Sequence, residues 1–170
     1  PANMADWERF VKRLVHPKKR VRIAIVGKYL DHKDAYKSIS ESINHAAAAL
    51  DCGADVVDVD AEVLETEDPA HYLRDVAGIL VPGGFGERGI EGKIAAAAFA
   101  RQHNVPYLGL CLGMQIATIE FARNVRGLAK ANSGLVFRKA RIANPGSPIP
   151  GTAVQNCTFG ASRISGMSAG

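Results

Sequence analysis

Residues 105–117 read VPYLGLCLGMQIA, and this stretch decides the fold. The apolar residues 105–110 predict a buried strand, and 112–125 predict the helix that follows it. Between them, GLCLG at 109–113 places glycines two residues on either side of a cysteine, which allows a sharp strand-to-helix turn. Such a turn holds Cys111 at the carboxyl end of the sheet and at a helix N-terminus, where the helix dipole favours the thiolate. We therefore predict that Cys111 is a nucleophile; a small buried cysteine is the structural alternative.

A second glycine-rich stretch, PGGFG at 82–86, follows the short apolar strand predicted at 78–81. Glycines let backbone N–H groups approach a ligand closely, and such groups can stabilise a developing oxyanion. The loop lacks the Gly-Lys-Ser/Thr ending of a nucleotide-binding P-loop. Together with the cysteine turn one strand later, it indicates a site built on two loops at one edge of a sheet.

The rest of the chain alternates between predicted strands and predicted helices. Helices are predicted at 4–15, 35–50, 68–76 and 91–103, and further strands at 22–26 and 54–60. Alternation with short connections is typical of parallel strands joined by right-handed crossovers. We therefore expect an α/β fold, a doubly wound parallel sheet in three layers.

Composition and charge exclude several classes of function. Of the 21 basic and 17 acidic residues, four basic and no acidic ones follow position 133, so the net charge of +4 comes from the C-terminal segment. We therefore expect no nucleic-acid partner. No run of about 18 apolar residues and no signal-peptide layout occur, so we expect no membrane partner. Three cysteines cannot form a closed disulfide set, which favours a reducing, cytoplasmic location.

Five runs carry a resemblance to a known family: VRIAIVGKY, DAYKS, LVPGGFGERGIEGK, VPYLGLCLGMQIA and IEFARNVRGLAKANS. Together they resemble the class I glutamine amidotransferases, and among these the C-terminal amidotransferase domains of the CTP synthase family. The resemblance covers 5–133. It implies a flavodoxin-like amidotransferase domain at 21–133, incomplete at its C-terminus, with a linker helix and linker at 1–20.

The resemblance also implies the roles of individual residues. Cys111 matches the nucleophile that attacks L-glutamine and forms a glutamyl thioester. Gly84 and the N–H of Leu112 match the oxyanion-binding positions. The residues that match the lining of the glutamine pocket are Leu112, Gly113, Met114 and Gln115.

The resemblance implies further partners outside this chain. In the family, the released ammonia serves the ATP-dependent amination of UTP to CTP by a synthetase domain, with Mg²⁺ and the activator GTP, in a homo-oligomer. That synthetase domain is absent from this sequence. We therefore expect no cofactor and no metal within the chain itself.

The sequence departs from the family pattern after Ser133. The family's catalytic His and Glu follow the cysteine, but here no His follows His103 and no acidic residue follows Glu120. Leu135 stands where the family has a substrate-binding Glu. Residues 134–170 are rich in Gly, Pro and Ser, and we expect a disordered tail unrelated to the family.

Three hypotheses follow from this pattern. The first is the glutamine-hydrolysing part of a CTP synthase, a ligase. The second is a truncated or frameshifted fragment without catalysis, acting at most as a binding module. The third, another α/β hydrolase with a cysteine turn, explains the five family-like runs poorly. The upstream histidines, His16, His32, His45, His71 and His103, fall on predicted helices or loops that do not match the family's catalytic base.

Overall fold

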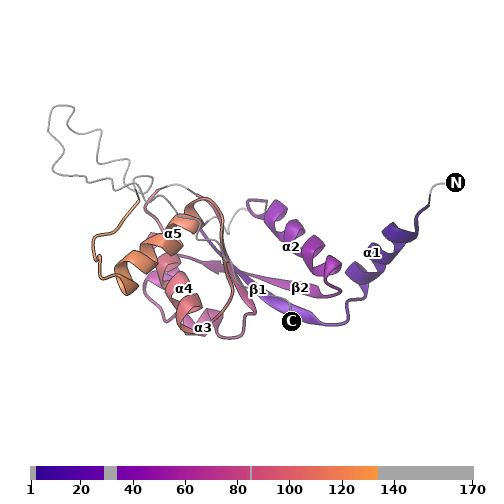
Figure 1. Cartoon of the computed structure of the whole chain (residues 1–170), viewed down its shortest axis with the longest axis horizontal. Coiled ribbons are helices and arrows are strands. Elements are labelled where there is room, and N and C mark those ends of the chain that lie inside the picture. The colour runs from indigo at the N-terminus through magenta and orange to yellow at the C-terminus, as the bar shows by residue number, and fades with distance from the viewer. Residues whose placement is uncertain (1–2, 29–33, 85, 134–170) are drawn as a thin grey trace, which may run out of the picture. The chain divides into compact units, whose positions relative to one another are not determined.

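The computed structural model describes residues 3–28, 34–84 and 86–133. Four parallel strands form one sheet in the order β2-β1-β3-β4 (Figure 1). The strands are β1 (Arg20–Gly27), β2 (Gly53–Asp60), β3 (Gly78–Val81) and β4 (Tyr107–Gly109). The predicted α/β class with a parallel sheet is confirmed. The predictions for His32, Leu135 and the tail lie outside the described residues.

The strands form where apolar, β-branched residues recur. All four residues of β3 are buried, as expected for a strand covered on both faces. In β1, neighbouring side chains point to opposite faces: Ala24 and Val26 enter one apolar cluster, and Ile25 enters another. The sheet therefore has two buried faces near its middle.

Helices cover these two faces. The helices are α1 (Ala5–Val15), α2 (Lys37–Ala49), α3 (Ala70–Leu73), α4 (Ile90–Gln102) and α5 (Leu112–Glu120). On one face α2 packs against Ile25 and Leu80 through Ile39 and Ile43. On the other face lie α3 and α4, and α5 packs against α4 (Figure 1). The result is the predicted three-layer arrangement.

The single helix predicted at 112–125 forms two separate elements in the structure. After α5 the chain continues as a π-helical turn (Phe121–Val125), closed by a hydrogen bond from the Arg126 N–H to the Phe121 carbonyl. Gly127, at φ +71°, then turns the chain away from the helix axis. Within this turn, the Nε of Arg123 donates to the Ala131 carbonyl at 2.8 Å.

Two other elements are shorter than predicted. The strand predicted at 105–110 is limited to β4, because Pro106 has no N–H to donate to the sheet. The helix predicted at 68–76 reduces to the single turn of α3, which begins after Pro69.

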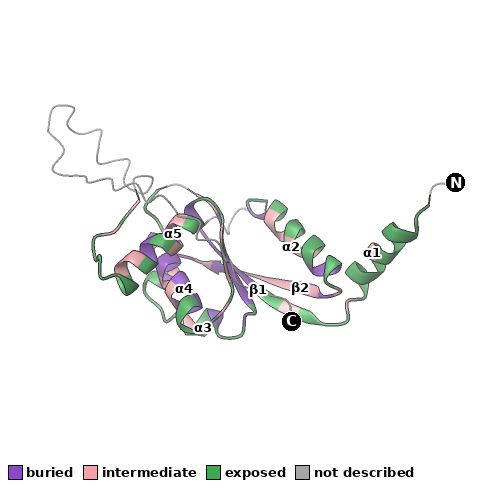
Figure 2. Ribbon diagram, viewed as in Figure 1, coloured by how far each residue is buried: buried purple, intermediate pink, exposed green. Residues whose placement is uncertain are grey.

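One part of the sheet is open on the α2 side. Beside α2, a groove of about 330 Å³ lies over β3 and β4 and is lined almost wholly by apolar side chains. Leu108 on β4 is 55% exposed there. Figure 2 shows the buried residues concentrated in the second half of β1, in β3 and in α4, whereas α1 has no buried residue. None of the helices in the described ranges has the length and apolar character needed to cross a bilayer.

Candidate active site

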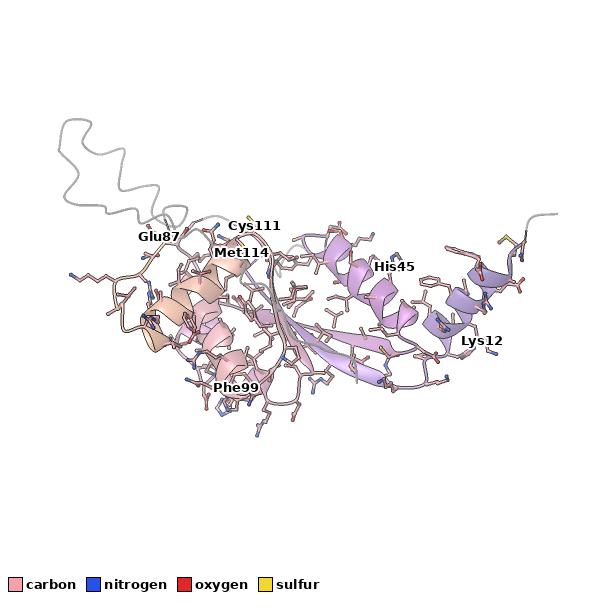
Figure 3. The ribbon with its side chains drawn as sticks, viewed as in Figure 1. Lys12, His45, Glu87, Phe99, Cys111 and Met114 are labelled. Atoms are coloured by element: carbon pink, nitrogen blue, oxygen red, sulfur yellow. The ribbon has the colours of Figure 1, made fainter. Side chains whose placement is uncertain are left out.

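Cys111 occupies the turn between β4 and α5, at the carboxyl edge of the sheet. Its backbone has φ +53° and ψ −106°, a combination that residues with a side chain rarely adopt. The residue is exposed and immediately precedes the first turn of α5. In Figure 3 the sulfur lies at the outer end of this turn, with Met114 beside it. The local geometry is that of the predicted nucleophile turn.

The two flanking glycines are required by close packing. A Cβ on Gly109 would lie 2.3 Å from the carbonyl carbon of Gly113, and a Cβ on Gly113 would lie 2.0 Å from the Val81 carbonyl oxygen. Both distances are far below any allowed contact. The glycines therefore let α5 start directly against β3 and β4, which fixes where the sulfur points.

Tyr107 stabilises the turn at Cys111 through a hydrogen bond. Its hydroxyl donates a 2.8 Å hydrogen bond to the Gly113 carbonyl, and burial raises the pKa of this phenol well above its usual range. The protonated form, which can donate, is thereby favoured at neutral pH. Sequence reasoning missed this residue. The signal that could have indicated its role was the presence of a tyrosine in a short apolar strand. A tyrosine buried in such a strand needs a hydrogen-bond partner for its hydroxyl.

The glycine loop after β3 lies beside the thiol. A Cβ on Gly83 would be 3.4 Å from the Cβ of Cys111 and 3.9 Å from its Sγ. The Leu110 N–H donates to the Val81 carbonyl at 2.9 Å. This bond joins the start of the glycine loop after β3 to the start of the cysteine turn after β4. Within the described residues, the N–H groups of Gly84 and Leu112 have no hydrogen-bond acceptor. Two adjacent loops thus present N–H donors and a sulfur at one edge.

The predicted pocket residues divide by exposure. Met114 is 61% exposed, so its side chain is available to a ligand, whereas Leu112 is 2% exposed and packs between α4 and α5. Leu112 and the buried Gly113 can therefore offer only backbone groups. Gln115 is partly buried, and its Oε1 accepts a hydrogen bond from the Ser133 hydroxyl.

The described histidines do not reach this edge. His103 ends α4, where its ring stacks on Phe99 with centroids 4.1 Å apart. Helices in this fold end at the opposite edge of the sheet, and Figure 3 shows Phe99 far from Cys111. His45 lies in the second half of α2 against Phe10 of α1, and His71 is exposed on α3. His16 ends α1.

Within the described ranges, neither a metal site nor a free buried carboxylate accompanies the thiol. No group of three His, Cys, Asp or Glu residues there could hold a metal ion. The buried Glu120 is engaged elsewhere: Arg101 donates to it at 2.7 Å and Asn124 at 3.2 Å. Burial alone would raise the pKa of Glu120, but these hydrogen bonds hold it below its usual value. Glu120 is therefore held by its two partners and lies apart from the predicted site.

The family model described as "Glutamine amidotransferase class-I" matches residues 31–156. The chain belongs to the class-I glutamine amidotransferase family. This amidotransferase chain is also similar to curated CTP synthases: it is 57% identical to that of Synechococcus sp. and 56% identical to that of Thermus thermophilus, each over 131 residues. Those residues are 77% of this chain but 24% of either relative. The chain thus spans about a quarter of the length of these relatives.

A solved structure is similar to the amidotransferase chain as well. It is the Trypanosoma brucei CTPS glutaminase domain with bound acivicin, with a TM-score of 0.64 and 46% sequence identity. The match covers 70% of this chain and 47% of that one. The amidotransferase boundary predicted after 133 stays a prediction.

Proposed function

We propose that this chain carries the thiol half of a glutamine-hydrolysing site of the CTP synthase type. The observation that carries the proposal is the turn at Cys111, an exposed thiol with φ +53° at a helix N-terminus beside a glycine loop. A helix N-terminus favours the thiolate, which is the attacking species. The similarity to CTP synthases supports glutamine as the substrate.

In the proposed reaction, the Cys111 sulfur bonds to the amide carbon of glutamine. The carbonyl oxygen becomes an oxyanion that the N–H groups of Gly84 and Leu112 stabilise. Its collapse breaks the C–N bond, and ammonia leaves after gaining a proton. Water then cleaves the thioester, giving glutamate and the free thiol. Met114 and Gln115 would line the pocket for the glutamine side chain.

We further propose that the ammonia serves a synthetase domain outside this chain. That domain would use ATP and Mg²⁺ to aminate UTP, with GTP as activator and a homo-oligomer as the working assembly. No residue of the present chain is assigned to those steps.

The second candidate is a chain that binds glutamine-like ligands without turnover. The position of the described histidines favours it, because His45, His71 and His103 lie away from Cys111. Among the described residues, none of these histidines could then remove and return protons at the thiol.

Labelling with acivicin followed by mass spectrometry of peptides tests the proposal. We expect a single adduct on Cys111, slowed by excess L-glutamine but not by D-glutamine. The matched control is Cys52→Ser, which should leave the labelling unchanged. An adduct on another residue, or no effect of L-glutamine, would refute a glutamine site at this turn.

A further inference from the structure

After α5 has ended, the chain returns to the edge of the sheet that carries the thiol. Beyond the π-helical turn, residues 126–133 run back past α5 (orange in Figure 1), and the Ser133 hydroxyl donates to Gln115 Oε1 near the start of that helix. We call residues 126–133 the return segment. None of its residues is buried, and Leu128 is 61% exposed. Hydrogen bonds, rather than apolar packing, therefore fix the path of the return segment.

Arg123 supplies a bond to the middle of the return segment. Its Nε donates to the Ala131 carbonyl at 2.8 Å, while its Nη1 donates to both carboxylate oxygens of Glu91 at 3.0 Å. One guanidinium thereby joins the return segment to the first turn of α4. The Arg123 side chain is only 17% exposed, so water competes weakly for these bonds.

Gln115 connects the return segment to the thiol. It lies one helical turn after Cys111, and side chains at this spacing share one face of a helix and lean toward its N-terminus. Ser133 donates to Oε1 and thereby fixes the orientation of the Gln115 amide. No described residue accepts a hydrogen bond from the Nε2 of Gln115. The Nε2 donors of that amide are thus available to a ligand at Cys111.

We propose that Arg123 is a positioning residue for the glutamine pocket, an inference that rests on the proposed function. By holding the Ala131 carbonyl, Arg123 keeps Ser133 within hydrogen-bonding distance of Gln115. The Gln115 amide then stays turned so that its Nε2 can donate to the bound glutamine. A lysine cannot replace Arg123, because an ammonium lacks the planar fork that reaches a carbonyl and a carboxylate at once.

A second arginine–glutamate pair joins α4 to α5 and provides a matched control. Arg101 of α4 donates to Glu120 of α5 at 2.7 Å. Among the described hydrogen bonds and ion pairs, neither of these residues joins the return segment. Loss of this pair should therefore lower stability without altering the Gln115 amide.

Alkylation of Cys111 by iodoacetamide at increasing L-glutamine concentrations tests the proposal in the full chain. The rate without glutamine reports the state of the turn, and the concentration that halves this rate reports glutamine binding. For Arg123→Met we expect an unchanged rate without glutamine. Its half-protection concentration should be about 3–10-fold above the parent's, which corresponds to the loss of one oriented hydrogen bond. Arg101→Met should keep the parent's half-protection concentration.

Two further variants separate the position of the segment from charge and from folding. Arg123→Lys keeps a cation for Glu91 but loses the bond to the Ala131 carbonyl. It should be more stable to urea than Arg123→Met and still show the raised half-protection concentration. Ser133→Ala removes only the last bond of the series and should raise that concentration equally. The double variant, Arg123→Met with Ser133→Ala, should raise it no further, because both changes act through one Gln115 amide.

Failure of this proposal and failure of the proposed function give different results. If L-glutamine does not slow alkylation of the parent, glutamine does not bind at this turn and both are overturned. If the parent is protected, this proposal alone is overturned by any of the following results. Arg123→Met shows the parent's half-protection concentration; Arg101→Met shows the same rise; the effects of Arg123→Met and Ser133→Ala add in the double variant; or Arg123→Lys and Ser133→Ala change the rate without glutamine.

Discussion

Tyr107 and Gly113 are joined by a 2.8 Å hydrogen bond in which the phenol donates to the glycine carbonyl. This bond links β4 to the first turn of α5, the two elements between which Cys111 lies. The strand and the helix are thereby held at one angle, and the cysteine backbone keeps its uncommon conformation. The turn at Cys111 thus depends on a residue that lies outside the turn itself.

Replacement of Tyr107 by Phe should therefore destabilise the domain. The change removes one hydrogen bond and leaves the Gly113 carbonyl without this partner, a loss of about 1–3 kcal/mol in the free energy of unfolding. Urea unfolding measures it. Alkylation of Cys111 by iodoacetamide should also change in rate, whereas Tyr72→Phe, at an exposed pair with Glu67, should leave that rate unaltered.

Substitution of Gly113 by Ala should be among the most damaging single changes. The new methyl group would lie 2.0 Å from the Val81 carbonyl oxygen, so α5 must move away from β3. We expect a loss of more than about 3 kcal/mol, or an insoluble chain. Gly127→Ala is the control: nothing lies within 4 Å, and only its φ of +71° opposes the change. It should lose about 1 kcal/mol.

Cys111 should be the most reactive thiol of the chain. It is exposed at a helix N-terminus, whereas Cys52 is 7% exposed against the apolar groove. Timed labelling with iodoacetamide and peptide mass spectrometry should show Cys111 modified well before Cys52. Faster labelling of Cys52 would contradict the assignment of the turn.

Glutamine turnover by the 170-residue chain should be no faster than that of its Cys111→Ala variant. General acid–base assistance is worth about 10²–10⁴-fold, and no described histidine lies near the thiol to provide it. A coupled assay for released ammonia measures the difference. Cys111-dependent ammonia release would show that another residue, or a partner chain, completes the site.

The ion pair between Arg101 and Glu120 should make stability depend on acid pH. Because the pKa of Glu120 is lowered in the folded state, its contribution is present above the unfolded value of about 4.3. It is lost as the pH falls through the folded value. Arg101→Met should unfold more easily at pH 7 and show less of this acid-dependent loss. Parallel curves for the two proteins would indicate that the pair contributes nothing.

The sequence was informative where interactions between neighbouring residues decide the structure. The apolar run GILV predicted β3, and the GLCLG spacing predicted the turn at Cys111, because both depend on neighbouring residues. The π-helical turn at Phe121–Val125 was not predictable, since nothing in the apolar spacing of this stretch distinguishes it from a continuation of α5. Tyr107 was missed for another reason: its partner is a backbone carbonyl six residues further on, and no pattern of side chains marks such a bond.

The strained backbone at Cys111 also bears on how this chain can be engineered. A non-glycine residue at positive φ stores about 1–2 kcal/mol that glycine would release. A screen that rewards only heat resistance or expression will therefore tend to select glycine at position 111. Such a screen would improve the protein by every bulk measure while removing the sulfur on which its proposed chemistry depends.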